Sequence, residues 1–147
     1  MTELSQHFFE DVTVGDALPN LEFTTSLAAL VMYAGATWDF HRYHYDPEFV
    51  KKVGMPAPFM DGQMLGALMS GMLMNWGGRD AFVRRLSYRQ RSTVFEGDKI
   101  VLSGVVVGKS QEAGRSLAHI SLNVTKDDGS PVSRDATASV ELAMRNL

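Results

Sequence analysis

The sequence predicts an α+β fold, in which helices come first in the chain and an antiparallel sheet follows. Apolar residues recur at helical spacing as far as Gly78, and beyond Arg79 they alternate with polar residues at the period of a β-strand. A long apolar segment at 62–78 carries no charged residue, which indicates a helix that the sheet must cover. Helices followed by consecutive strands are typical of the α+β class.

The N-terminal part predicts a short strand and a helix. Leu21–Thr24 fits a strand, and Ser26 or the threonines before it offer cap oxygens for a helix with apolar residues as far as Ala34. Gly35 is expected to weaken the end of this helix. Residues 37–44 are then predicted to form a loop or a distorted turn.

Two further helices are predicted before the sheet. Asp46 is a good N-cap with Pro47 at the first helical position, and the short helix that they begin is stopped by Gly54 and the prolines after it. Gly62 opens the long apolar helix, which a Gly-Gly pair ends. Because no charge interrupts this helix, we expect it to form the centre of the core.

The second half predicts about four antiparallel strands. Its β-branched residues alternate with polar ones, and Asp128-Gly129 is a hairpin turn signal. Consecutive strands joined by tight turns make an antiparallel sheet. The expected strands are residues 81–93, 98–108, 117–125 and 132–144.

Length and composition limit the class of protein. The 147 residues fit one domain over 1–147, the formal net charge is -3, and cysteine is absent. No basic run suggests nucleic-acid binding, and disulfides and thiolate metal sites are excluded. The N-terminus lacks the apolar segment of a signal peptide, and no run reaches the ~20 apolar residues of a membrane span. We therefore expect a soluble cytoplasmic protein without nucleic-acid or membrane partners.

Side chains that can carry chemistry concentrate just before the apolar helix. Asp39, His41 and His44 crowd into a few residues, and Gly62 then opens the helix. A carboxylate, an imidazole that is largely neutral near pH 7, and a helix N-terminus are the groups needed to add or remove water beside a carbonyl. The stretch 33–64 is therefore the candidate active site.

This stretch resembles the MaoC-like, or (R)-specific enoyl-CoA hydratase, family. The spacing Asp-x4-His-x-Asp and the distance onward to a glycine that opens a helix both match the family pattern. The residues that fit are Tyr33, Asp39, His44, Asp46, Phe59 and Gly62. The resemblance implies a single MaoC-like hot-dog domain over residues 1–147, in which an antiparallel sheet wraps around a long central helix.

Some positions depart from that pattern. Trp38 stands where the family has glycine, His41-Arg42 where it has Asn-Pro, and Asp61 where it has histidine. The segments 36–40, 82–86 and 139–145 look closer to one branch of the family. That branch is the small catalytic subunit of the two-subunit enoyl-CoA hydratases that act on steroid side chains in actinobacteria.

The resemblance implies the roles of the candidate residues. Asp39 and His44 would carry acid–base catalysis on one water, and the backbone N–H of Gly62 would stabilise the thioester oxygen. Further oxyanion or substrate contacts would come from Phe59, Met64 and His41. The implied enzyme is a hydro-lyase without a cofactor or metal. It adds water across the 2,3 double bond of a trans-2-enoyl-CoA, with a steroid-type acyl group if the branch applies.

The implied assembly is a homodimer, or a heterodimer with another MaoC-like chain, with acyl-CoA near the subunit boundary. The alternatives are a non-catalytic or partner-dependent acyl-CoA-binding subunit, a hot-dog thioesterase, and an enzyme of the ketosteroid-isomerase type.

Each candidate residue also has a structural explanation. Asp39 is a plausible turn cap, and His44 a plausible half-buried histidine bonded to the backbone. Asp46 is expected to cap the helix that Pro47 begins, which weakens a metal site built from the same cluster. Asp61 caps the long helix or binds a ligand, and we favour the cap. His41 supports the site from outside or is merely exposed.

Overall fold

The structure is a computed structural model that describes residues 6–145. Its helices are α1 (Leu27–Thr37), α2 (Pro47–Lys52) and α3 (Gly62–Gly77), with short 3₁₀ helices at Phe9–Asp11 and Arg42–His44. Its strands are β1 (Leu21–Thr24), β2 (Phe82–Ser87), β3 (Lys99–Glu112), β4 (Arg115–Lys126) and β5 (Pro131–Glu141). The strands form one antiparallel sheet in the order β1-β3-β4-β5-β2.

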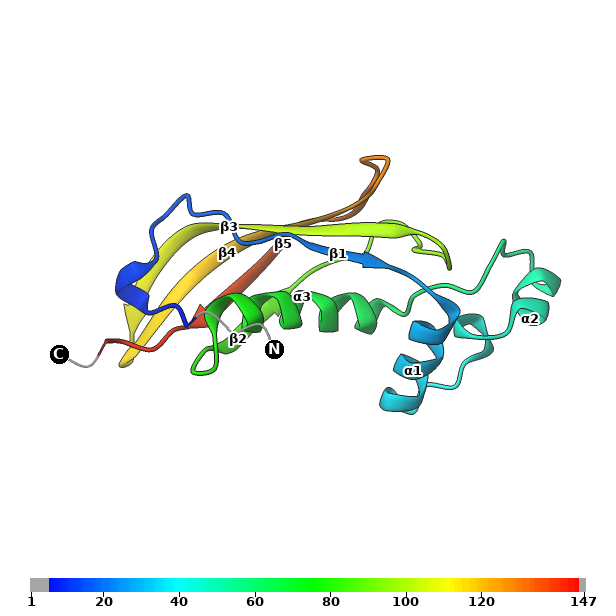
Figure 1. Ribbon diagram of the computed structural model, residues 1–147, viewed down its shortest axis with the longest axis horizontal. Helices are drawn as coiled ribbons and strands as arrows, with labels where there is room; N and C mark the ends of the chain where they lie inside the picture. Colours follow the sequence, from blue (N-terminus) through cyan, green and yellow to red (C-terminus); the bar gives the residue numbers. More distant parts are fainter. Residues whose placement is uncertain (1–5, 146–147) are drawn as a thin grey trace.

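The sheet curls over α3, while α1 and α2 lie beyond one end of the sheet (Figure 1). This arrangement confirms the predicted α+β hot-dog fold, with an antiparallel sheet around one long central helix. Both described chain ends lie at the opposite end of the sheet from α1. The segment that carries the candidate site is therefore the region where α1, α2 and the start of α3 meet.

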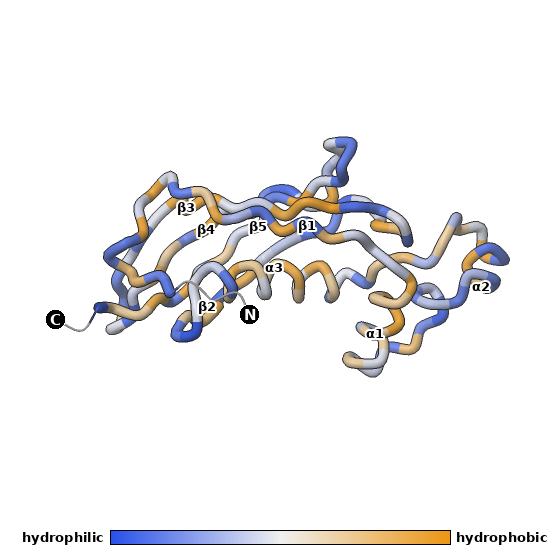
Figure 2. Tube along the Cα trace, viewed as in Figure 1, coloured by the Kyte–Doolittle hydropathy of each residue, from blue (hydrophilic) through white to orange (hydrophobic). Residues whose placement is uncertain are grey.

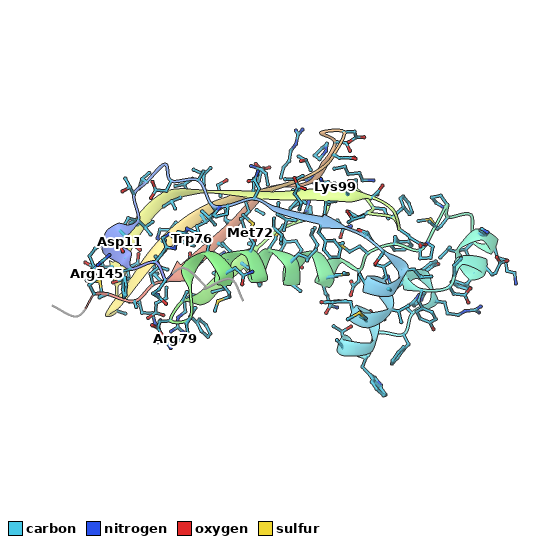
Figure 3. The ribbon with its side chains drawn as sticks, in the orientation of Figure 1. Asp11, Met72, Trp76, Arg79, Lys99 and Arg145 are labelled. Carbon is cyan, nitrogen blue, oxygen red and sulfur yellow. The ribbon has the colours of Figure 1, made fainter. Side chains whose placement is uncertain are left out.

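Apolar burial between α3 and the sheet explains the fold. The helix is apolar through its middle (Figure 2). Leu65, Met69 and Leu73 are completely buried on it, and Met72 and Trp76 lie between α3 and the sheet (Figure 3). Strand β4 buries every second residue over most of its length, as the alternating pattern of residues 117–125 predicted. Each fully buried side chain of this size contributes roughly 1.5–3 kcal/mol.

The termini of the described chain are fastened to the end of the sheet away from α1. Arg145 forms an ion pair of 2.6 Å with Asp11 (Figure 3), and the Lys109 ammonium donates to the carbonyls of Phe9 and Val12. Hydrogen bonding to Arg145 lowers the pKa of Asp11. These contacts hold the segment before β1 against the sheet, and they are remote from the candidate site.

Several element boundaries differ from the sequence-based prediction, and β3, for example, continues from the predicted end at 108 to Glu112. Helix α1 continues through Gly35 to Thr37, whose hydroxyl donates to the carbonyl of Tyr33 at 2.9 Å. The strand predicted for 81–93 ends at Ser87, because Tyr88 leaves the sheet for Gly62, and beyond it Gln90 and Arg91 meet β5 only in isolated contacts. Arg42–His44, in the stretch predicted as a loop or a distorted turn, forms a single 3₁₀ turn.

One close contact holds the start of α3 in place. The Tyr88 hydroxyl donates a hydrogen bond of 2.9 Å to the carbonyl of Gly62. To reach it, the tyrosine ring crosses α3 at Gly66, where a Cβ would lie 2.8 Å from Tyr88 Cζ. Only glycine leaves room for this approach.

We predict that Gly66→Ala destabilises the protein by about 1–3 kcal/mol, because the new methyl group displaces the Tyr88 ring. Gly71→Ala is the matched control on the same helix, since a Cβ there meets no atom within 4 Å. It should stabilise the protein by about 0.5–1 kcal/mol through higher helix propensity. Urea unfolding measures both, and equal stability of the two variants would contradict this account of Gly66.

Candidate active site

Three segments meet around one pocket of about 190 Å³, including its open mouth. Helix α1 supplies one wall, the turn after it supplies two polar side chains, and the start of α3 closes the third side. The lining residues are Leu30, Tyr33, Ala34, Thr37, Asp39, His44, Asp61 and Met64. The structure thus brings together Asp39, His44 and Met64, three of the residues singled out in the sequence.

Asp39 reaches the pocket because α1 ends in a left-handed residue. Trp38 has φ 60° and ψ 24°, a conformation that costs a residue other than glycine about 1–2 kcal/mol. The turn lets the N–H of Asp39 donate to the carbonyl of Ala34 at 3.0 Å. One carboxylate oxygen of Asp39 accepts the N–H of His41 at 3.2 Å. Asp39 is therefore held as a turn residue and still lines the pocket.

His44 is fixed by a hydrogen bond to the chain that leads into α3. Its Nδ1 lies 2.8 Å from the carbonyl oxygen of Phe59. Because a carbonyl only accepts, Nδ1 carries the proton, and the neutral ring keeps its lone pair on Nε2. The Phe59 ring also packs edge-on against the imidazole, with the ring centres 5.5 Å apart. Phe59 thus orients His44 and is not itself part of the pocket lining.

Asp46 is a structural residue, as the sequence predicted. One of its oxygens accepts the N–H of Phe49 at 2.9 Å and caps α2, and the other is held by Arg42 at 2.6 Å. The Phe49 N–H, followed by the Arg42 guanidinium, lowers the pKa of the Asp46 carboxyl. Both oxygens are therefore engaged outside the pocket.

Asp61 is the N-cap of α3, which confirms the favoured prediction for this residue. Its Oδ1 accepts the N–H of Gln63 at 3.0 Å. Asp61 also lines the pocket, and its negative charge acts on two phenols. Burial raises the pKa of both Tyr33 and Tyr88, and the Asp61 carboxylate is the next cause for each. Two neutral phenols therefore surround this carboxylate at neutral pH.

Gly62 and His41 lie beside the pocket without lining it. Gly62 is the first residue of α3, where backbone N–H groups have no partner within the helix. His41 is exposed, and its ring stacks on Tyr43 with the ring centres 4.5 Å apart. The backbone N–H of His41 donates a hydrogen bond to the Asp39 carboxylate, so His41 stabilises the turn.

The α1 wall of the pocket was only partly anticipated from the sequence, because the candidate stretch 33–64 includes Tyr33, Ala34 and Thr37 but not Leu30. Leu30, Tyr33, Ala34 and Thr37 recur at spacings of three or four residues, so they share one face of the helix. This spacing could have identified the whole wall from the sequence, because the same face of the helix leads directly to Asp39.

Among residues 6–145, no three histidine, aspartate or glutamate side chains lie close enough to hold a metal ion. Arg84 pairs with Glu141 and covers the Phe82 ring at the edge of the sheet.

The chain matches the model of a known protein family. A model of the MaoC-like domain matches residues 11–127, and the chain therefore belongs to the MaoC-like domain family. No curated protein matches the sequence significantly. No helix within the described part of the chain is long and apolar enough to cross a membrane.

Several solved structures share the fold. An (R)-hydratase from A. caviae involved in PHA biosynthesis is 22% identical, with a TM-score of 0.79 over 90% of this chain and 98% of that one. The unliganded R-hydratase PhaJ1 from Pseudomonas aeruginosa is 18% identical, with a TM-score of 0.85 over 95% and 87%. The ChsH1-ChsH2 complex from Mycobacterium tuberculosis contains a chain that is 25% identical, with a TM-score of 0.74 over 90% and 98%.

Proposed function

We propose that this chain is an enoyl-CoA hydratase/dehydratase, a hydro-lyase that adds water across the 2,3 double bond of a trans-2-enoyl-CoA. The observation that carries the proposal is the convergence of Asp39 and His44 on one pocket at the start of α3. Membership of the MaoC-like family supports the same chemistry.

The reaction requires hydroxide character at C3 and a proton at C2. We assign the base to Nε2 of His44, because Nδ1 is committed to the Phe59 carbonyl. As the water oxygen bonds to C3, Nε2 takes one of its protons, and the imidazolium then returns a proton to C2. Asp39 orients the water and stabilises the imidazolium. The cycle leaves both residues in their starting protonation states.

Negative charge develops on the thioester oxygen during this step. We assign its stabilisation to the backbone N–H of Gly62, at the positive end of the α3 dipole. The apolar residues Leu30, Ala34 and Met64 line the same pocket and would contact only the reacting end of the acyl group. A bulky steroid-type acyl group is proposed on the resemblance to that branch of the family.

We propose that the chain works as a homodimer or as a heterodimer with another MaoC-like chain. Strand β2 is an edge of the sheet and carries the exposed Phe82, so its outer side offers unpaired backbone groups to a partner. The similarity to a chain of the ChsH1-ChsH2 complex supports a heteromeric arrangement.

The alternative is a subunit that binds acyl-CoA but is inactive without a partner. The small pocket favours it, because the space open to the centre of a water-sized sphere is only about 10 Å³, far below the roughly 300–1,000 Å³ of sites that enclose whole ligands. A partner chain would then complete the acyl site.

We predict that the purified protein, alone or with its partner chain, hydrates crotonyl-CoA or a bulkier enoyl-CoA, measured as loss of enoyl-thioester absorbance. Asp39→Asn and His44→Ala should each lower turnover by about two orders of magnitude or more. Asp128→Asn and His119→Ala are matched controls outside the pocket. Asp128 lies in the turn between β4 and β5. His119 lies on β4 and bonds to serines of the two neighbouring strands, β3 and β5. They should keep turnover within about twofold.

If the Asp39→Asn and His44→Ala variants both keep the turnover of the wild type, the assigned pair is refuted. Release of free thiol from the acyl-CoA would instead indicate a thioesterase. Binding without turnover, even with the partner, would indicate a non-catalytic subunit.

We predict that Gly62→Pro lowers kcat by about 10²–10³-fold, because proline removes the proposed oxyanion donor. The helix should tolerate the change, because proline suits the first helical position. Asp61, with φ −65° and ψ 142°, also already has the extended backbone conformation that a residue before proline prefers.

Gly62→Ala is the control for this prediction. It keeps the N–H, and its Cβ would make only an ordinary contact of 3.4 Å with the Gln90 side chain. Similar kcat values for the two variants would remove Gly62 from the oxyanion site.

A further inference from the structure

The two capping aspartates of this region differ in what holds their second oxygen. Asp46 caps α2 with Oδ1, and Arg42 holds its Oδ2. Asp61 caps α3 with Oδ1, but its Oδ2 is buried and has no hydrogen-bond partner among residues 6–145. A buried carboxylate oxygen without a donor is unfavourable, and such a group in a native protein needs an explanation.

The nearby hydroxyl groups do not satisfy this oxygen. The Tyr88 hydroxyl donates to the Gly62 carbonyl. Tyr33 faces the charge of Asp61, yet no hydrogen bond joins the two side chains. The cap itself occupies only Oδ1. A donor for Oδ2 must therefore come from a molecule that enters the pocket.

The size of the pocket indicates which molecule this is. The space open to the centre of a water molecule is about 10 Å³, which is roughly the room for one water. A bound water also needs two to four polar partners. Asp61 lines this space together with Asp39, His44, Tyr33 and Thr37, so the partners are present.

We propose that Asp61 is a positioning residue that binds the reacting water through Oδ2. This inference rests on the proposed hydratase function and adds a third residue to its site. Asp61 accepts the hydrogen that stays on the oxygen and becomes part of the product hydroxyl. The other hydrogen then faces Nε2 of His44 and the Asp39 carboxylate, and it is the proton that leaves when the oxygen bonds to C3.

The first test is a crystal structure of the wild-type protein at a resolution that shows ordered water. We expect a water within about 3.2 Å of Asp61 Oδ2 and of either His44 Nε2 or the Asp39 carboxylate. Direct bonding of Oδ2 to the Tyr33 hydroxyl, without a water in the pocket, would overturn the proposal. This result does not depend on turnover, so it separates a failure of the Asp61 role from a failure of the hydratase proposal.

The second test is Asp61→Ser, because serine is an equally good N-cap and removes the second oxygen together with the negative charge. We expect kcat for crotonyl-CoA to fall at least about tenfold while KM changes less than about threefold, since water is mispositioned and substrate binding is kept.

Asp46→Ser is the matched control for this substitution, because it also keeps a cap and removes an oxygen, but outside the pocket. Its kcat should stay within about twofold of the wild type. If Asp61→Ser keeps wild-type kcat and unfolds at a higher urea concentration, Asp61 is only a cap and the proposal is wrong.

Discussion

Burial of α3 against the sheet is the constraint on which the rest of the structure depends. An uncharged apolar helix is stable in water only when other parts of the protein cover it, and the curled sheet provides that cover. Since β1 to β5 cover α3, its N-terminus emerges at the end of the sheet where α1 and α2 lie (Figure 1). The position of the helix start therefore decides where the site is.

Short-range contacts then fix the site to the helix start. Tyr88 holds the Gly62 carbonyl, and Phe59 holds the proton-bearing nitrogen of His44. The left-handed Trp38 turns the chain so that Asp39 reaches the same pocket. Strained backbone in a non-glycine residue is expected where the surrounding structure and the function both require it. Here the strain lies directly beside the proposed acid–base pair.

Local rules made some of these features predictable from the sequence. The α3 helix follows from an uninterrupted apolar run, and the Asp46 and Asp61 caps follow from an aspartate before a helix start. The pairing of Asp39 with His44 came from the resemblance to a family, because their spacing alone also fits a turn cap and a backbone-bonded histidine. Both structural explanations are in fact present, since Asp39 accepts the His41 N–H and His44 bonds to Phe59.

Features set by tertiary contacts could not be predicted in this way. Strand β2 stops at Ser87 because Tyr88 leaves the sheet for Gly62, a contact 26 residues away in the chain. Helix α1 passes Gly35, whose cost in a helix is only about 1 kcal/mol and is outweighed by the contacts around it. The unpaired oxygen of Asp61 depends on three segments meeting at once, so no single stretch of sequence reveals it.

The central claim is that Asp39 and His44 act together on one water. The most direct measurement is kcat/KM for enoyl-CoA hydration by the double variant Asp39→Asn/His44→Ala beside both single variants. If the two residues act as a unit, kcat/KM of the double variant should be at most about threefold below that of the less active single variant. A double variant slowed by the product of the two single effects would contradict the claim, because the residues would then contribute independently.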